Sequence, residues 1–303
     1  MQEVKNHKEI NLEGSVSAIF VTYNSADIIK ESISKVISFP EISICYVVDN
    51  GSSDDIENII KNINSDKIKL IKNTENLGFG VANNIALEQV DTPYALCINP
   101  DAILDNESLQ DLLSKFSIYT NAAVISPTLT YDDGTIQESY KKNVFDREKN
   151  KYPFIIPDGD ICADFLSGAI LLFDMKKLCN VGFFDPKIFL FYEDDDLCIR
   201  IKKAGYDLIL SNSSKAIHLF GKSSPDTAKH RIFKHKHMTT SRLYLEEKYN
   251  GDKAAKKLSY KFFLLYGIKT ILYAIILKSK KREIYYSRLR AVKSFIKQSV
   301  NTN

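Results

Sequence analysis

The sequence predicts an α/β fold, with a mostly parallel central sheet covered by helices on both faces and a helical C-terminal extension. Two observations support this prediction. Short apolar, β-branched runs alternate with helical stretches from residue 17 onward, which is typical of parallel sheets. From Thr239 the chain has the pattern of helix alone. Hydrophobic residues make up 44% of the 303 residues and charged residues 26%, which fits an ordinary globular core and excludes wholesale disorder.

The first part of the chain contains predicted strands and helices in alternation. The strands are expected at 17–23, 43–49, 67–72 and 94–98, and the helices at 27–38, 54–63 and 79–90, with Ser25 as the first N-cap. In such sheets, ligands bind at the carboxyl ends of the strands. This rule selects four candidate segments: residues 22–24, 49–50, 76–80 and 99–101.

Beyond residue 121 the pattern is less regular. Residues 122–131 are strand-like, and residues 163–173 are apolar again. Between them, residues 141–163 are polar and contain two prolines, which predicts a long loop, and loops of this length are usually functional. A helix is expected at 193–204, ended by Gly205, before a short strand at 207–211 that leads to His218.

Charge is unevenly distributed along the chain. After residue 252, thirteen Lys and Arg accompany one acidic residue, so this segment carries +12 and the preceding chain −9. Residues 262–277 are apolar but interrupted by Gly267 and Lys269, and are too short to span a bilayer. An apolar stretch beside a basic cluster predicts a helix in the interface of an anionic membrane. The alternative is a C-terminal helix that packs on the α/β domain.

These patterns divide the chain into four parts. They are a tail (1–14), the α/β domain (15–222), a helical linker region (223–252) and a basic amphipathic helical segment (253–303). The five cysteines form no C-x-x-C pair, which indicates buried thiols in a reducing compartment. The N-terminal region has no apolar leader pattern, so a cytoplasmic protein is expected. The basic segment contains no recognisable nucleic-acid-binding module, so nucleic acid is not expected as a partner.

Two positions are candidate metal ligands. Asp101 follows the predicted strand 94–98, where its carboxylate would be exposed at the carboxyl end. Mg²⁺ and Mn²⁺ accept one or two protein oxygen ligands when a diphosphate supplies others, although a turn or helix-capping Asp has the same local pattern. His218 ends an apolar strand, and that pattern alone favours a core histidine over a ligand. The histidines that follow it lack a metal-binding spacing: His230, His235 and His237.

Four consecutive acidic residues, 193–196, follow an apolar run and open a predicted helix. The helix dipole offsets part of their repulsion, and apolar surroundings raise carboxyl pKa values. They contain a general base for a substrate hydroxyl, or they only complement the dipole. Asp196 and Arg200 are expected to pair at i, i+4. The glycines of 76–84 allow close backbone approach to a ligand, but match neither a Walker loop nor the dinucleotide fingerprint.

Taken together, these pieces resemble the family 2 glycosyltransferases of the GT-A fold. The matched motifs include Asn99-Pro100-Asp101 and Glu193-Asp194-Asp195. The others are residues 21–24, 48–54, 76–84, 167–169 and 182–185, the rest of 192–200, and His218 with Gly221 and Ser223. The sequence is most similar to the rhamnosyltransferase-like branch of bacterial surface-polysaccharide synthesis.

The resemblance implies a role for each matched position. The nucleotide-binding residues would be Thr22, Tyr23, Asn24, Asp49, Asn76, Gly78, Asn84 and Asn99. A divalent cation, Mg²⁺ or Mn²⁺, would bind Asp101 and His218, with Asn99 standing where the D-x-D motif has its first Asp. Asp194 would be the catalytic base. The acceptor and donor-sugar side would contain Ser167, Gly168, Ala169, Glu193 and Arg200.

The implied reaction is an inverting transfer of a sugar from a nucleoside diphosphate to a hydroxyl of a growing cell-surface polysaccharide. Rhamnose from dTDP-rhamnose is the expected donor group, and the acceptor would be polyprenyl-diphosphate-linked, reached at the inner face of the cell membrane. The alternatives are a UDP-sugar-dependent transferase of the same fold and a non-catalytic sugar-nucleotide-binding scaffold. A nucleotidyltransferase is disfavoured, because the loop 22–27 has neither a glycine nor a cation.

Overall fold

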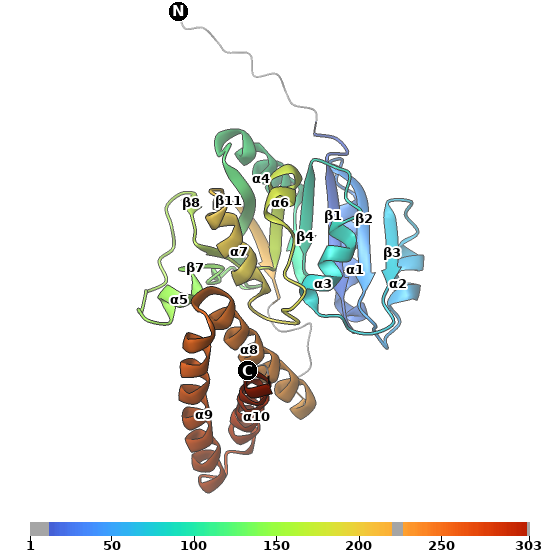
Figure 1. Ribbon diagram of the computed structural model, residues 1–303. Coiled ribbons are helices and arrows are strands. Elements are labelled where there is room, and N and C mark those ends of the chain that lie inside the picture. The colour runs from blue at the N-terminus through green and yellow to red at the C-terminus, as the bar shows by residue number, and fades with distance from the viewer. Residues whose placement is uncertain (1–11, 220–226, 302–303) are drawn as a thin grey trace, which may run out of the picture.

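The computed structural model describes residues 12–219 and 227–301. Most of the predicted tail, together with Gly221 and Ser223, lies outside these residues. Figure 1 shows an α/β unit with helices on both sides of its sheet, and three long C-terminal helices that form a separate lobe below it.

The first half of the sheet is parallel, as predicted. Its strands lie in the order β3-β2-β1-β4. Their bounds are β1 Val16–Thr22, β2 Ile42–Asp49, β3 Ile68–Lys72 and β4 Tyr94–Ile98. The connecting helices are α1 Ala26–Ile37, α2 Ile56–Ile63 and α3 Phe79–Leu87. Ser25 stands at the first N-cap position but its side chain makes no capping bond; Asp54 Oδ2 accepts from the first N–H of α1 instead, at 2.8 Å.

The second half of the sheet is mixed. β10 (Ile170–Asp174) runs antiparallel between β4 and β6 (Ala122–Thr130), and β6 pairs in parallel with β11 (Asp207–His218). β11 also pairs antiparallel with β5 (Ala102–Leu104) and β8 (Ile161–Cys162).

β11 continues to His218, well past the predicted end at residue 211. The register of β11 against β6 shifts between Ser211 and Lys215, which places three serine hydroxyls near one carboxylate. Ser211, Ser213 and Ser214 all donate to Asp111 Oδ2 of α4 (Asn106–Ile118). The polar interruption that ends the pattern in the sequence is therefore satisfied inside a continuous strand.

The predicted loop 141–163 contains short elements of its own. β7 (Tyr140–Lys141) pairs antiparallel with β9 (Phe165–Leu166), and α5 (Val144–Arg147) follows β7 directly. Asn143 caps α5 by accepting from two backbone N–H groups at 3.1 Å. The segment is therefore anchored at both ends.

Apolar side chains fill both faces of the sheet. One buried cluster lies under α1, α2 and α4, and includes Phe20, Ile29, Ile33 and Leu112. The other lies under α3, α6 (Met175–Val181) and α7 (Glu193–Lys203), and includes Phe173, Leu178 and Ile201. Three of the five cysteines are buried as predicted, Cys45, Cys97 and Cys198, and burial raises the pKa values of their thiols. The prediction was wrong for Cys162 and Cys179, which are exposed.

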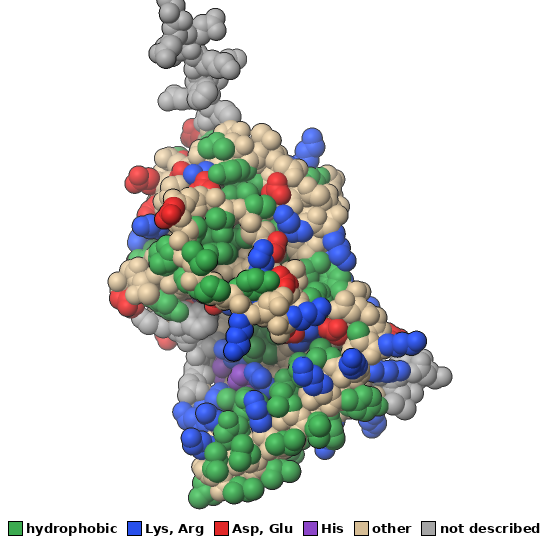
Figure 2. Space-filling model, turned by 90° about the vertical axis from the view of Figure 1, so that its left-hand side faces the viewer, with side chains coloured by type: hydrophobic (Ala, Val, Ile, Leu, Met, Phe, Trp, Pro, Cys, Tyr) green, Lys and Arg blue, Asp and Glu red, His purple; other side chains and the backbone are tan. Residues whose placement is uncertain are grey.

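The C-terminal lobe consists of α8 (Ala228–Asn250), α9 (Asp252–Ile275) and α10 (Ser279–Asn301). It has a small core, formed by Leu243, Ala255, Tyr266, Val292 and Phe295. Figure 2 shows hydrophobic side chains over the lower part of the molecule, with lysines and arginines among and above them. In the part of the chain that is described, α9 is the one helix long and apolar enough, by length and composition, to cross a membrane, with 11% of its apolar window buried. The prediction that this region is too short to span was wrong, because the helix begins at Asp252, ahead of the apolar stretch 262–277.

Candidate active site

The carboxyl ends of β1 and β2 meet in one corner of the site. The Asn50 N–H donates to the carbonyl oxygen of Thr22 at 2.9 Å. Asp49 Oδ1 accepts from the Ser52 N–H at 2.9 Å, and Ser52 Oγ accepts from the Asn24 N–H at 3.0 Å. The corner is therefore a rigid network of turns in which three of the expected nucleotide residues lie together.

Two side chains of this corner differ in exposure. Tyr23 is 47% exposed at the rim. Thr22 is fully buried, and its Oγ1 has no hydrogen-bond partner among the residues described. The ring of Tyr23 is therefore accessible for stacking by a planar group.

Asn50 lies in one of the four segments selected from the sequence, but its central role was not predicted. Its Nδ2 donates to Asn76 Oδ1 at 3.1 Å and to the Gly78 carbonyl at 3.2 Å. Its Oδ1 accepts from Asn73 Nδ2 and from the Leu77 N–H, both at 3.0 Å. One buried amide therefore holds the loop 73–78 against the end of β2, and its only signal in the sequence is its place one residue after Asp49.

Gly78 is required where the loop meets the segment before α7. Its φ is +88°, and a Cβ there would lie 2.1 Å from the carbonyl oxygen of Phe189. The next N–H, of Phe79, donates to that same oxygen at 3.1 Å. The close approach of the two segments brings the nucleotide loop next to the acidic helix.

Asn84 and Arg200 both bind the backbone of the segment 181–185. Asn84 donates to the Phe184 carbonyl at 2.8 Å and accepts from the Phe184 N–H at 2.9 Å. Arg200 donates to the carbonyls of Val181, Gly182 and Phe183. Asn84 was expected to border the nucleotide and Arg200 to lie on the sugar side. Both polar atoms of the Asn84 amide and both Nη atoms of Arg200 are occupied in holding this segment.

Asp101 and His218 lie side by side, buried where β5 pairs with β11. Asp101 Oδ1 is 3.4 Å from His218 Nε2. The Nδ1 of His218 is 3.1 Å from Gln137 Oε1, and Gln137 Nε2 donates to the carbonyls of Thr130 and His218. Because the Gln137 amide donates to two carbonyls, its oxygen faces Nδ1, so a neutral His218 carries its proton there. Nε2 then presents a lone pair toward the carboxylate.

This donor set fits a divalent cation. Two acceptor atoms 3.4 Å apart can both reach one cation at bond lengths of about 2.1 Å. The carbonyl-bonded Gln137 fixes the imidazole tautomer as outer partners of metal-bound histidines do. No cluster of three or more His, Cys, Asp or Glu suited to a metal is found within residues 12–219 and 227–301. Further ligands would come from a bound diphosphate or from water.

A short backbone segment joins this metal side to the acidic helix. The Asn99 N–H donates to the Ala169 carbonyl at 2.8 Å, and the Gly168 N–H donates to Asp194 Oδ2 at 3.3 Å. The Ser167 N–H donates to the Ser139 carbonyl at 2.8 Å. The expected residues 167–169 therefore lie between the strand end that carries Asp101 and the expected base.

The acidic cluster at the start of α7 differs from residue to residue. Asp194 is partly exposed, and burial raises its pKa although the N–H groups of Gly168 and Asp195 stabilise its charge. Glu193 is buried next to Gly80, and burial and the charge of Asp194 raise its pKa well above the usual range. The Glu193 Oε2 has no hydrogen-bond partner in the described parts of the chain. A neutral Glu193 lowers the repulsion on Asp194.

Asp195 and Asp196 are held by cations from other elements. Arg147 of α5 lies 2.8 Å from Asp195 Oδ2, yet burial and the charge of Asp194 raise the pKa of Asp195 to about 7. Asp196 is fully buried and pairs with Arg200 at 2.8 Å, as predicted. It also accepts from Lys248 Nζ at 2.5 Å and from Tyr249 Oη at 2.7 Å, both of α8.

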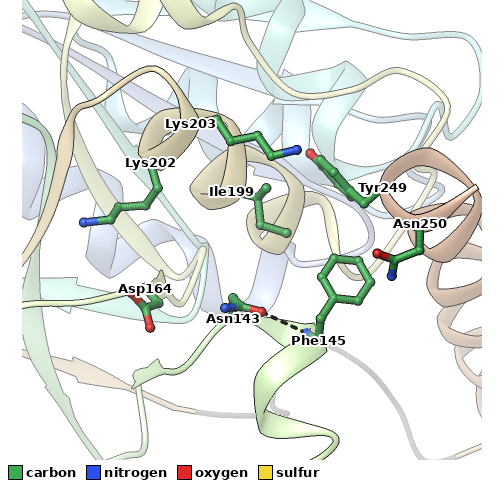
Figure 3. Close-up of a pocket in the computed structure, with 8 residues that line it drawn as sticks. All are labelled: Asn143, Phe145, Asp164, Ile199, Lys202, Lys203, Tyr249 and Asn250. Carbon is green, nitrogen blue, oxygen red and sulfur yellow. Dashed lines mark hydrogen bonds between the residues drawn. The ribbon is translucent and has the colours of Figure 1, made fainter.

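A cavity of about 420 Å³ lies at the far end of α7. Figure 3 shows Lys202 and Lys203 on one side, with Tyr249 and Asn250 opposite. None of the residues expected from the sequence lines this cavity.

Comparisons with known proteins bear on this arrangement. A family model described as "Glycosyl transferase family 2" matches residues 17–177. The rhamnosyltransferase WbbL of Escherichia coli is 26% identical over 215 residues, which cover 57% of this chain and 81% of that protein. The N-acetylglucosaminyl-diphospho-decaprenol L-rhamnosyltransferase of Mycobacterium tuberculosis is 23% identical over 268 residues, covering 77% and 84%.

The fold also matches solved structures. The mannosyltransferase PcManGT of Pyrobaculum calidifontis, in complex with GDP-Man and Mn²⁺, superposes with a TM-score of 0.57. The identity is 16%, and the match covers 92% of this chain and 86% of that one. At this identity the likeness concerns the fold alone.

Proposed function

The chain belongs to the family 2 glycosyltransferases, and we propose that it transfers rhamnose from dTDP-rhamnose to a hydroxyl of a polyprenyl-diphosphate-linked glycan, with inversion at the anomeric carbon. The names of two curated relatives support rhamnose, and one of them names a diphosphate-linked polyprenol. The observation that carries the proposal is the backbone link from Asn99 through residues 168–169 to Asp194. It puts a partly desolvated carboxylate beside the strand end that carries Asp101.

The donor would lie at the carboxyl ends of β1, β2 and β4. The exposed ring of Tyr23 and the rigid turn around Asp49 would receive the nucleoside. Asp101 and His218 would hold Mg²⁺ or Mn²⁺, which would stabilise the negative charge of the leaving nucleoside diphosphate. The solved structure of a similar fold contains Mn²⁺ with its nucleotide sugar.

Asp194 would act as the general base. Its raised pKa brings its proton affinity closer to that of the acceptor hydroxyl in the transition state, while the Gly168 and Asp195 N–H groups fix its orientation. A single displacement on the sugar needs one base and no carboxylate nucleophile. Burial and the charge of Asp194 raise the pKa of the neighbouring Glu193, which favours the negative charge on Asp194.

Binding and donor hydrolysis with dTDP-, UDP- and GDP-sugars test this proposal, each with Mg²⁺, Mn²⁺ or EDTA. Wild type should bind dTDP-rhamnose with metal and hydrolyse it slowly. Asp194→Asn should retain binding and lose turnover by about a hundredfold or more. Asp133→Asn, in an exposed turn, is the matched control. If the protein prefers a UDP- or GDP-sugar, that nucleotide sugar replaces dTDP-rhamnose as the proposed donor. If none of the three classes binds in a metal-dependent manner, the proposal of a catalytic donor site is contradicted.

We further propose that α9 docks the enzyme on the inner face of the cell membrane. Leu264, Ile268, Ile271 and Ile275 recur at helical spacing, and all are exposed. On the opposite side, α9 packs on α10, whose Arg288 lies over the rings of Tyr266 and Tyr285. Spanning the bilayer would carry this guanidinium into the hydrocarbon, so an interfacial position is favoured.

Co-sedimentation with vesicles of phosphatidylglycerol and phosphatidylcholine tests the docking. Ile271→Glu should lower the partition coefficient about tenfold, because an apolar contact is lost and a negative charge faces an anionic surface. Ile118→Glu on α4 is the control, since Ile118 is 64% exposed and Ile271 65%. Equal sedimentation of the two variants would contradict docking through α9.

A further inference from the structure

The segment 138–164 encloses a cavity that the proposed donor site and base do not use. Its volume is about 600 Å³. It is lined by β7, by α5 and the loop that follows it, and by β8 with the residues after it. We call it the loop cavity, and its charged and aromatic lining residues are Glu138, Tyr140, Lys141, Lys142, Arg147, Lys151, Tyr152, Phe154 and Asp164.

The charge of the loop cavity is positive. Four cations line it, against two carboxylates. Lys141 lies 3.4 Å from Glu138, and Lys142 lies 3.3 Å from Asp164. These pairs are partly exposed, so each binds weakly and its lysine can turn to a ligand at little cost. Lysine ammonium groups around a cavity of this size favour an anion with several oxygens, such as a phosphate ester.

The wall of the loop cavity is apolar beside these cations. The rings of Tyr140 and Phe154 lie 5.6 Å apart, and the Tyr140 hydroxyl donates to the carbonyl of Ile155. Ile155 itself is 64% exposed. Cations next to an exposed apolar wall suit a phosphate that is esterified to a hydrocarbon chain better than they suit a free sugar.

The loop cavity is connected to the proposed base through two of its lining residues, Arg147 and Asp164. Arg147, which lines it, is the residue that contacts Asp195 at 2.8 Å. From its wall at Asp164 the chain continues through β9 to Gly168, whose N–H contacts Asp194. The Asp101–His218 pair lies beyond Ala169, at the end of β4. An anion in the loop cavity would therefore lie on the acceptor side of Asp194 and not at the donor diphosphate.

We propose that the loop cavity binds the diphosphate of the lipid-linked acceptor, with the apolar wall next to its first prenyl unit. This proposal rests on the proposed function for the class of acceptor. It assigns to the segment 138–164 the recognition of the carrier, in addition to any contact with sugars.

Calorimetric binding of geranyl diphosphate, inorganic pyrophosphate and geraniol to the full-length protein tests the proposal. Wild type should bind geranyl diphosphate most tightly and geraniol least. Lys142→Gln with Lys151→Gln should weaken geranyl diphosphate about tenfold or more, since two cations are lost. Lys30→Gln with Lys35→Gln is the matched control: it removes the same charge, and Lys35 pairs with Glu31 at 3.4 Å on the exposed face of α1.

Each outcome separates the loop cavity from the other sites. Binding of dTDP and sedimentation with phosphatidylglycerol vesicles should be the same in both double variants, and dTDP should not compete with geranyl diphosphate. Equal affinity of the two double variants for geranyl diphosphate would overturn the proposal. If the Lys142/Lys151 variant loses vesicle binding as strongly as it loses geranyl diphosphate, the two lysines contact lipid headgroups, and the proposal is also overturned. If no nucleotide sugar binds but the Lys142/Lys151 variant still loses affinity for geranyl diphosphate, the donor assignment is refuted and the proposed role of the loop cavity stands.

Discussion

Replacing Tyr249 with phenylalanine removes one hydroxyl from the contact between α8 and α7. That hydroxyl donates to Asp196 Oδ1 at 2.7 Å, and Asp196 is fully buried. A hydrogen bond to a charged group contributes about 1.5–3 kcal/mol. Lys248 and Arg200 still compensate the carboxylate, so a loss of about 2 kcal/mol in the free energy of unfolding is expected. The ring can keep its place, where it contacts Lys203 at 4.4 Å.

The assays are urea unfolding at neutral pH and, without urea, donor hydrolysis by the same protein preparations. Because Asp196 lies two residues after Asp194 on α7, loosening it should displace the base and lower kcat about tenfold. Tyr244→Phe is the matched control. The Tyr244 hydroxyl on the same helix donates to Asp185 Oδ2 at 2.9 Å, outside α7, and its loss should affect stability more than kcat.

Two results would refute this reasoning. A destabilisation below about 0.5 kcal/mol for Tyr249→Phe would mean that the other two donors compensate Asp196 fully. An equal loss of kcat in the two variants would mean that α8 does not position the base through Asp196.

Three further predictions concern the nucleotide loop, the acidic cluster and the metal side. Gly78→Ala should lower the free energy of unfolding in urea titration by about 3 kcal/mol or more. Gly134→Ala is the control: its φ is +81° but no atom lies within 4 Å of an added Cβ, so the loss should be only about 1 kcal/mol. Asp195, with its pKa raised to about 7, stabilises the fold while protonated. This contribution is complete below the ordinary pKa near 4 and is lost as the pH rises through 7, so the stability of wild type relative to Asp195→Asn should fall by about 4 kcal/mol between pH 4 and pH 8. Gln137→Leu removes the acceptor that fixes the tautomer of His218, and should weaken Mn²⁺-dependent binding of dTDP about tenfold by calorimetry, with metal-free binding unchanged.

The parallel half of the sheet was predictable from the sequence to within one residue at each strand end. β1, β2 and β4 are mostly buried apolar runs between helices, while β3 is half-buried with two exposed lysines, and these patterns are local. β11 was cut short in the prediction because its serines resemble a turn. The carboxylate of Asp111, about a hundred residues earlier, accepts from all three hydroxyls within the strand.

The candidate site was predictable by position but not by side-chain role. Asp101, His218 and Asp194 were selected, and the structure gathers the first two and links the third through Gly168. The role of Asn50 was missed, because an asparagine after a strand looks like any turn residue.

By itself, the sequence determined the order of strands and helices, the strand ends at which polar residues collect, and the separation of an acidic α/β domain from a basic helical segment. These follow from local periodicity and from composition. Only the tertiary structure decided which groups meet. Gln137 is 81 residues from His218, and Tyr249 is 53 residues from Asp196. Hydrogen bonds of this kind depend on the packing of whole elements, which no local pattern encodes, and the same packing formed the loop cavity and turned Arg200 toward the backbone of 181–183.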